Sequence, residues 1–265
     1  MTLEARIGIV GGNGWLGNAI ARAVVAASAV DPARLTLSSR SDRRDAAAIP
    51  GARWTKDNGE LVDRSDVVVL SVRPDQFPAV RIAARGKLVI SVMAGVPARV
   101  IAERTGTPEV VRAVPNAAAA IRRSFTPWHA APSVSTASKQ TVQTLFEACG
   151  DAAEVLLEAH VDYCTGMTGS GAAFPALLAQ AMITHAVAQG LPPAFAERAA
   201  TAVVAGASQL LVGGSGRPAE VVQAMIDYRG TTAAALQAMM DNGFVEAVAA
   251  GLEAAAVKAA ALASG

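Results

Sequence analysis

The chain has 265 residues, a formal net charge of +1, and a composition that is 52% hydrophobic and 17% charged. This length accommodates one large domain or two small ones. The near-neutral charge gives no basic footprint of the kind that binds nucleic acid or other polyanions. Cys149 and Cys164 match no metal-ligand spacing and the histidines are scattered, so we expect reduced packing thiols and no metal site.

A glycine cluster follows the first apolar run. Gly12, Gly14 and Gly17 fit the spacing G-x-G-x-x-G between a β-type run, 7–10, and a helical pattern, 15–27. Such glycines permit a tight turn, close approach of backbone to a pyrophosphate, and packing of helix on strand. An ordinary glycine-rich turn has the same spacing, but strand, loop and helix in this order predict a dinucleotide site. The predicted residues of this site are Gly12, Asn13, Gly14, Trp15 and Leu16.

The second apolar run is 35–38 and ends about twenty residues beyond the glycine loop. In dinucleotide-binding folds the residue that contacts the cofactor ribose lies at this position. NAD sites place Asp or Glu there. Here the residues that follow are Ser39, Arg40, Ser41, Arg43 and Arg44. Hydroxyl and guanidinium groups suit a 2′-phosphate, so we predict NADP(H), with NAD(H) as the alternative. The other interpretation is that these arginines form a solvated loop.

Strand and helix patterns alternate through the first part of the chain. The strand candidates are 7–10, 35–38, 67–72, 88–92 and 110–114, then 128–131 and 154–157. The helical patterns are 15–27, 44–49, 60–64, 74–84, 97–104 and 136–149. This order predicts a parallel, doubly wound sheet with right-handed crossovers. Strand signals end near residue 161, so we predict an α/β protein: a Rossmann-type domain over 1–160 and an all-α domain over 161–265.

Ligands of an open doubly wound sheet bind beyond the carboxyl ends of its strands. Val72, Arg73 and Pro74 follow the third long strand pattern, Ala94 follows the fourth, and Asn116 follows the fifth. Each turn alone is ordinary. Together, on the same edge as the glycine loop, they predict a cleft whose walls face the nicotinamide.

The second half of the chain is almost uncharged. Between residues 163 and 216 only Glu197 and Arg198 carry a formal charge. We exclude a membrane span because glycine, proline and polar residues interrupt every apolar run of about twenty residues. Helices that are apolar all round are otherwise buried in a large core, which predicts cover from a second subunit. The first residues lead into the first strand without a signal-peptide pattern, and we expect a cytoplasmic protein.

Two clusters of small and hydroxyl residues in the second half are expected to open helices. They are 165–171 and the run Gly230, Thr231 and Thr232. Helix starts of this kind bind carboxylates through free N–H groups. The equally open alternative is that the glycines pack closely and that Thr231 and Thr232 only cap a helix.

The order and spacing of several segments resemble the pyrroline-5-carboxylate reductase family over almost the whole chain. The matching segments are the glycine loop, 57–58, 65–74, 91–95, 112–116, 168–171, 230–232 and 243–244. The resemblance implies a Rossmann domain followed by a helical domain that interleaves with its copy in a homodimer. Dimers of the family can assemble further.

The resemblance also implies a reaction, in which NADPH gives a hydride to the C=N carbon of a cyclic imino acid. The expected conversion is 1-pyrroline-5-carboxylate to L-proline, in proline biosynthesis. The family pattern makes Thr232 the catalytic residue, hydrogen-bonded to the ring nitrogen. It assigns the substrate carboxylate to Gly230, Thr231 and Thr232, the adenosine ribose to Asn58, and the nicotinamide to Val72, Arg73, Pro74, Ala94 and Asn116. We also expect Asn116 and Arg229 to contact the substrate.

The chain departs from the family pattern beside the expected active site. The glycine loop is longer, Ala117 and Ala118 replace a hydroxyl and a proline, and the run 227–229 replaces Ser-Pro-Gly. Arg229 either holds a second anionic group or pairs with Asp227. This change leaves open a paralogous NADPH-dependent reductase with a different imine or carbonyl substrate. A third hypothesis is a regulatory or scaffold protein that binds the cofactor without turnover.

Overall fold

A computed structural model of the chain describes residues 2–40, 49–213 and 217–262. The strands are β1 (Ile7–Val10), β2 (Leu35–Ser38), β3 (Arg53–Thr55), β4 (Val67–Leu70), β5 (Leu88–Ser91), β6 (Val110–Ala113), β7 (Ser124–Ala130) and β8 (Gly150–Glu154). The helices of this part are α1 (Trp15–Ala26), α2 (Asn58–Asp63), α3 (Ala98–Thr105), α4 (Thr136–Glu147) and α5 (Glu158–Cys164), with short 3₁₀ turns η1 (Pro32–Arg34), η3 (Pro74–Ala79) and η4 (Ala117–Ile121).

The described strands form one sheet in the order β3-β2-β1-β4-β5-β6-β7-β8. All neighbouring pairs are parallel except β6 and β7. The doubly wound fold is confirmed, and the five strands from which a parallel sheet was predicted are parallel: β1, β2, β4, β5 and β6. The reversed direction of β7 was not predicted. The link between β6 and β7 is too short for a crossover, and Arg122 at its end adopts a left-handed conformation with φ of +58°. A short link can only return the chain antiparallel.

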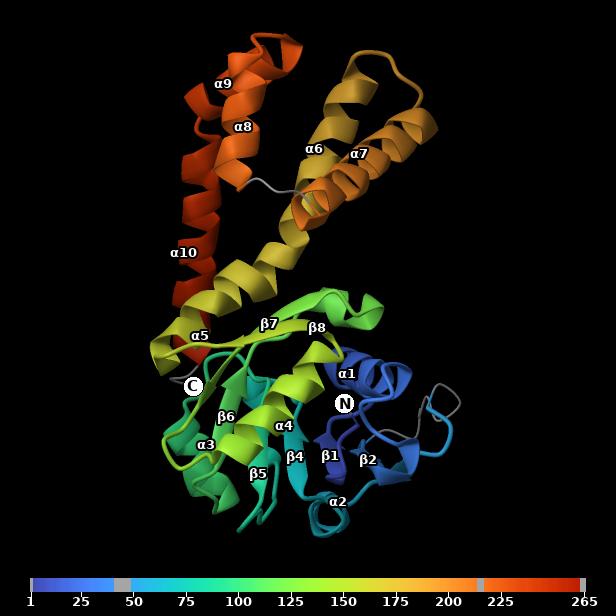
Figure 1. Cartoon of the computed structure of the whole chain (residues 1–265), viewed down its shortest axis with the longest axis vertical. Coiled ribbons are helices and arrows are strands. Elements are labelled where there is room, and N and C mark those ends of the chain that lie inside the picture. The colour runs from blue at the N-terminus through green and yellow to red at the C-terminus, as the bar shows by residue number, and fades with distance from the viewer. Residues whose placement is uncertain (1, 41–48, 214–216, 263–265) are drawn as a thin grey trace. The chain divides into compact units, whose positions relative to one another are not determined.

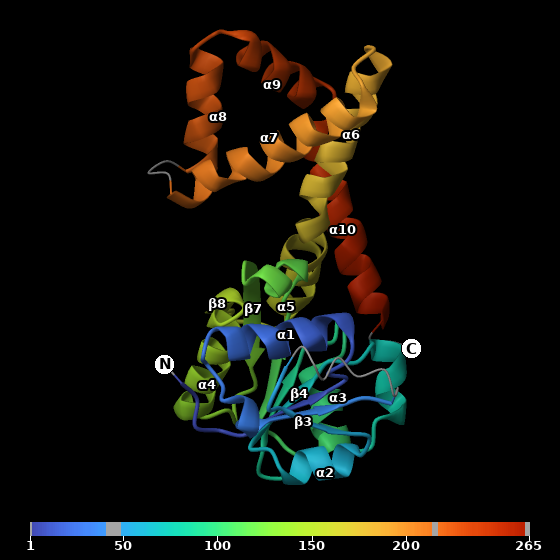
Figure 2. The same cartoon turned by 90° about the vertical axis from the view of Figure 1, so that its right-hand side faces the viewer.

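The sheet is covered on both faces, which is why its central strands are continuous apolar runs. Val67 and Val69 of β4 join the core beneath α1 and α4, whereas Val68 and Leu70 join the core beneath α2 and α3. Figure 1 shows α1 and α4 on the same side of the sheet, and Figure 2 shows α1 and α2 on opposite sides. The alternation follows from the two-residue period of a strand.

Several elements differ from their sequence prediction. The last strand is β8, at 150–154 and not 154–157, because it pairs with β7 from Ser124 and Gly150 onward. The helix expected over 74–84 is only the 3₁₀ turn η3, since Pro78 lies inside it and cannot donate a helical hydrogen bond. The short edge strand β3 was not predicted. The helix expected over 44–49 falls almost wholly outside the described residues.

Beyond α5 the chain is helical throughout the described residues, as predicted. The elements are the π turn η5 (Thr165–Gly169), the 3₁₀ turn η6 (Ser170–Ala173), α6 (Phe174–Ala188), α7 (Pro193–Gly213), α8 (Pro218–Asp227), α9 (Thr231–Asp241) and α10 (Phe244–Leu262). The structure divides into two compact units, Met1–Ala172 with Leu252–Gly265, and Ala173–Gly251. Within the second unit α6 packs on α7 and α8 packs on α9.

Candidate functional site

The glycine loop between β1 and α1 packs its backbone against the end of β4. Gly11 has φ of +82°, and a Cβ on it would lie 2.3 Å from the carbonyl oxygen of Ser71. A Cβ on Gly17 would lie 2.5 Å from the carbonyl oxygen of Gly11, so helix and strand meet here without side chains between them. The turn falls at Gly11, one residue before the motif spacing placed it. Gly12 instead packs on the side chain of Leu37.

The start of α1 is suited to an anion. Gly14 is its N-cap, in an extended conformation with no side-chain cap, and no acidic residue lies in the first turn. The first N–H groups of a helix have no partner within the helix, and the helix dipole adds positive potential there. Trp15 and Leu16 are the first two residues of α1, so their backbone N–H groups belong to this helix start, and Trp15 is 64% exposed.

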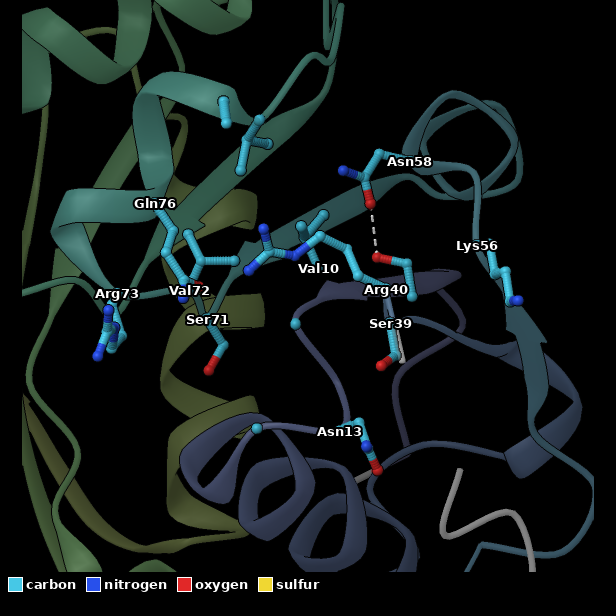
Figure 3. A pocket seen from close by; sticks show the side chains of 15 residues that line it. Val10, Asn13, Ser39, Arg40, Lys56, Asn58, Ser71, Val72, Arg73 and Gln76 are labelled. Carbon is cyan, nitrogen blue, oxygen red and sulfur yellow. Dashed lines mark hydrogen bonds between the residues drawn. The ribbon is translucent and has the colours of Figure 1, made fainter. Parts of the chain in front are cut away.

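A pocket of about 340 Å³ opens beside this loop (Figure 3). Its lining residues are Val10, Gly11, Asn13, Gly14, Ser38, Ser39, Arg40, Lys56, Asn58, Ser71, Val72, Arg73, Gln76, Ala79 and Val80. The structure thus brings together these predicted cofactor residues: Asn13, Gly14, Ser39, Arg40, Asn58, Val72 and Arg73. The remaining ones, Gly12, Trp15, Leu16, Pro74, Ala94 and Asn116, are not among the lining residues, and Ser41 lies outside the described residues.

One side of the pocket is basic and hydroxylic. Figure 3 shows Ser39, Lys56 and Asn58 on this side, with Arg40 between them and Val72. The Ser38 hydroxyl donates a hydrogen bond of 2.7 Å to Oδ1 of Asn58, which ties the end of β2 to the start of α2. None of the described lining residues is acidic. An anionic group therefore meets no like charge on these walls.

The opposite side of the pocket comes from the segment after β4. Val72, Arg73 and Gln76 lie there in Figure 3. Arg73 pairs with Asp75 at 2.5 Å, and both side chains are exposed, so this ion pair is a weak constraint. Pro74 begins η3 and Ala94 lies in the turn after β5, where it is half-buried.

Sequence reasoning missed Lys56 and Gln76. Lys56 directly follows β3, a strand too short to leave an apolar pattern, so the turn at its end was not recognised. Gln76 lies in the segment that was predicted as an α-helix. The basic character of Lys56, two residues before the predicted Asn58, was the signal that could have found it.

Of the five predicted substrate residues, Asn116 lies in the first unit, and the other four lie in the second: Arg229, Gly230, Thr231 and Thr232. Gly230 is the N-cap of α9, extended and without a side-chain cap, so the expectation that Thr231 and Thr232 cap the helix with their hydroxyls is wrong. Both threonines are exposed, and their hydroxyls remain available to a ligand. The carboxylate of Asp227 accepts a hydrogen bond from Gln223, and no ion pair joins it to Arg229 among the described residues.

The small-residue run 165–171 does not begin a helix. The chain enters it directly from α5, and its hydroxyls bond backward along the helix, Thr165 to Val161 and Thr168 to Cys164. The N–H groups of this run are therefore not those of a free helix start. The expectation that this run opens a helix and offers a carboxylate site is wrong for that reason.

Among the described residues, the thiols and the other side chains that commonly bind metals form no further site. Burial raises the pKa of the Cys149 thiol to about 12 and raises that of Cys164. Among the described residues, no group of His, Cys, Asp or Glu is arranged to hold a metal ion.

Comparison with known proteins identifies the family. Residues 158–262 match the family model described as pyrroline-5-carboxylate reductase dimerisation, and residues 6–95 match that of NADP oxidoreductase, coenzyme F420-dependent. The pyrroline-5-carboxylate reductase of Pseudomonas aeruginosa is 35% identical over 212 residues, which cover 78% of each chain. The chain belongs to the pyrroline-5-carboxylate reductase family. The resemblance inferred from its motifs is thereby confirmed.

Solved structures of the family have the same fold. The pyrroline-5-carboxylate reductase of Coxiella burnetii superposes with a TM-score of 0.88 at 26% identity, covering 98% of this chain and 99% of that one. The Plasmodium falciparum enzyme, solved with NADP bound, gives a TM-score of 0.86 at 22% identity and covers 99% and 100%. The family's Rossmann sheet and helical segment are thus both present here.

The dimerisation match begins at the first residue of α5 and ends with α10. One continuous helical stretch in it, Glu158–Ala188, is long and apolar enough to cross a membrane by length and composition alone. The glycine, proline and polar residues expected to interrupt the stretch do not end it, because the chain continues through η5 and η6 into α6. The family model that matches this region is described by its dimerisation.

Proposed function

We propose that this chain reduces the C=N bond of a cyclic imino acid with a hydride from NADPH, and that the substrate is 1-pyrroline-5-carboxylate, which becomes L-proline. The observation that carries the proposal is the pocket at the carboxyl edge of the sheet, which is lined by the glycine loop and by a basic wall with no acidic side chain among the described lining residues. It occurs in a member of the pyrroline-5-carboxylate reductase family.

The pocket residues fit the parts of NADP(H). The backbone of Gly14 and the start of α1 suit the pyrophosphate, because backbone N–H groups at a helix start bind anions. A Cβ on Gly14 would lie 3.1 Å from the Gly11 carbonyl oxygen, so the loop has little room for a side chain at this position. Ser39 and Arg40 suit the 2′-phosphate, with Lys56 as a further cation on the same wall. Val72 and Arg73 continue the pocket toward the nicotinamide.

The start of α9 suits the carboxylate of the imino acid. Gly230 and Thr231 present backbone N–H groups with no side-chain cap competing for them, and α9 has no acidic residue in its first turn. The hydroxyl of Thr232 would hydrogen-bond the ring nitrogen and so orient the ring. The hydride goes to the C=N carbon and the nitrogen takes the proton that completes the amine, which the hydroxyl can donate and regain from solvent. Such a site accelerates the reaction chiefly by orientation and proximity.

We further propose that the chain has a cofactor domain of residues 1–160 and forms a homodimer through interleaved helices of residues 161–265. Leu177, Leu210 and Val212 are 71%, 74% and 71% exposed. Large apolar side chains exposed on one chain mark a surface that a partner covers. We place the enzyme in the cytoplasm, and assembly of dimers into larger rings remains compatible with this surface.

The test is oxidation of NADPH by the purified protein with 1-pyrroline-5-carboxylate, run beside NADH. We expect turnover on the order of 1–10³ s⁻¹ with preference for NADPH. Thr232→Ala should lower kcat by about 10²-fold or more while NADPH binding is retained. Thr141→Ala is the control, because Thr141 is a partly exposed threonine of α4 whose hydroxyl bonds to the Ala137 carbonyl of its own helix. Absence of turnover with intact NADPH binding would contradict the assigned substrate.

A second substrate class is favoured by the residues before α9. Arg229 has φ of +56° and no ion pair to Asp227, and Tyr228 is 84% exposed. A cation held in a left-handed conformation beside the carboxylate site suits a substrate with a further anionic group. Arg229→Gly and Arg229→Asn both accept this backbone conformation. If Arg229 contacts such a group, both variants should improve turnover of pyrroline-5-carboxylate and impair that of the dianionic substrate.

A further inference from the structure

The turn after β6 is fastened to the helical segment after α5 by one side chain, that of Asn116. Its Nδ2 donates a hydrogen bond of 2.9 Å to the backbone carbonyl of Thr168. Its Oδ1 accepts one of 2.9 Å from the N–H of Ala118, which caps the 3₁₀ turn η4. Both ends of the amide are thus in use, and they join two segments that are 52 residues apart in the chain.

The acceptor lies in a distorted part of the helix. At Thr165–Gly169 the regular α5 widens to a π turn, a form that is rare and found mostly at functional sites. This turn is held tightly within the first unit, because a Cβ on Gly166 would lie 2.8 Å from the Leu252 carbonyl oxygen of α10. On its other side, a Cβ on Gly169 would lie 3.1 Å from Val114. The turn after β6 therefore rests on a rigid support.

The turn after β6 lies on the edge of the sheet where the pocket opens. β6 runs parallel to β5 and β4, so its carboxyl end shares an edge with Ser71 and Val72, which line the pocket. Asn116 itself does not line the pocket. Its two bonds fix the orientation of the amide, and each end of the amide can still form one further hydrogen bond.

We infer that Asn116 is a positioning residue, which acts through the Thr168 carbonyl to hold the turn after β6 in place at the reacting end of the cleft. The inference rests on the proposed reductase function. The family pattern implied direct nicotinamide and substrate contacts for this side chain, and the bonds to Thr168 and Ala118 give it a supporting role in addition. Hydride transfer requires the donor and acceptor carbons to meet in a narrow range of distance and angle, so a loosened wall lowers kcat more than it weakens cofactor binding.

The test uses two substitutions that separate the roles of the amide. Asn116→Ser retains a good capping hydroxyl for η4 but cannot reach Thr168. Asn116→Asp retains the capping oxygen and places a second oxygen against the Thr168 carbonyl. Both variants are compared with the wild type for kcat, for KM of the imino acid, for the Kd of NADPH and for Tm.

The matched control is Gln143→Ala. Gln143 also uses both ends of its amide, since Nε2 donates to the Ala152 carbonyl and Oε1 accepts from Trp128, but it joins α4 to β8 away from the pocket. The Gln143→Ala substitution removes hydrogen bonds that join two elements, as the Asn116 substitutions do. We expect it to lower Tm to a similar extent and to leave kcat within about twofold of the wild type, because it supports no wall of the cleft.

The expected result is a kcat lowered about 10- to 100-fold in both Asn116 variants, with the Kd of NADPH within about threefold. An unchanged kcat overturns the inference. A Kd raised tenfold or more at unchanged kcat also overturns it, since that is the signature of a direct cofactor contact. If the wild type itself does not reduce pyrroline-5-carboxylate, the proposed substrate fails separately. The inference is then tested by the fluorescence emission of bound NADPH, compared with that of the wild type. A change in both Asn116 variants but not in Gln143→Ala supports the inference, and no change in the Asn116 variants overturns it.

Discussion

The guanidinium of Arg112 lies 2.8 Å from the carboxylate of Glu158 and joins the end of β6 to the first residue of α5. Only 2% of the Arg112 side chain is exposed, and its other terminal nitrogen lies 2.5 Å from Asp162. The Glu158 oxygen also accepts a hydrogen bond from the N–H of Ala98 at the start of α3. Burial acts to raise the pKa of Glu158, but these donors outweigh it and hold the pKa below its ordinary value.

Neutralising both carboxylates should destabilise the protein, because Arg112 is buried. In Glu158→Gln/Asp162→Asn the guanidinium stays buried without a counter-charge, and we expect a loss of about 3–5 kcal/mol in the free energy of unfolding. Each single variant should lose less than half of this, because the other carboxylate remains. Denaturant unfolding of the wild type, the two single variants and the double variant measures these free energies. Glu4→Gln, which breaks the exposed pair with Arg34, should cost less than about 1 kcal/mol and serves as the control. A double variant as stable as Glu4→Gln would contradict the assignment.

Stability should fall in acid partly through Asp66. Hydrogen bonds from Arg6 lower the pKa of Asp66 to about 2, against an ordinary value of 3.8. Because the pKa is lower in the folded state, the stabilisation is present above about pH 4 and is lost as the pH falls toward about 2. Asp66→Asn should therefore flatten the decline in unfolding free energy over this window.

The control for the acid experiment is Asp63→Asn, an exposed carboxylate of α2 that forms no ion pair among the described residues. It should leave the pH dependence unchanged. Equal slopes for wild type and Asp66→Asn between about pH 4 and pH 2 would show that the Arg6 pair does not titrate as described.

Two glycines of the same loop should respond differently to alanine. In Gly17→Ala the methyl group meets the Gly11 carbonyl oxygen at 2.5 Å, which forces α1 away from β1, and we expect a loss of about 2–4 kcal/mol in stability. In Gly14→Ala the backbone already has an extended conformation that alanine adopts, and the nearest contact is 3.1 Å. That variant should lose about 1 kcal/mol or less, since alanine is a poorer N-cap than glycine, and should weaken NADPH binding. Thermal unfolding and NADPH titration of both variants check the contrast, and a reversed pattern would refute it.

Cofactor choice should depend on the basic wall of the pocket. Arg40→Ser removes a charge-assisted bond to the 2′-phosphate, so the KM for NADPH should rise about 10- to 100-fold. The KM for NADH should change less than about threefold, because NADH has no 2′-phosphate for the missing group to contact. Lys56→Ser should act in the same direction. Arg99→Ser, on the exposed side of α3 and outside the pocket lining, is the control. Equal effects on the two cofactors would place Arg40 elsewhere than at the 2′-phosphate.

Much of the fold followed from local pattern. β1, β2, β4, β5 and β6 are short apolar runs, and burial on both faces of the sheet makes such runs easy to recognise. β3 was missed because it is an edge strand, and only one of its residues, Thr55, is buried. The direction of β7 was missed because it depends on the length of a link and on pairing with β6, neither of which leaves a periodic signal.

The candidate site shows the same division. Asn13, Gly14, Ser39 and Arg40 were predicted because each lies within a few residues of a recognisable strand end. Lys56 and Gln76 enter the same pocket from segments whose structure the sequence did not reveal. Asn116 was assigned from the family pattern to the nicotinamide and to substrate, but its side chain bonds to Thr168, a contact that only the packing of α5 beside β6 creates.

The sequence by itself determined the order of strands and helices, the glycine loop and the family, because these depend on periodicity and on motifs of neighbouring residues. Tertiary structure alone decided which glycine makes the turn, which side chains share the pocket and which polar groups bond to one another across the sheet edge. The physical reason is that hydrogen bonds such as those of Arg112 and Asn116 join residues 46 to 52 positions apart. Their partners are chosen by how the sheet and α5 pack, and no local pattern records that choice.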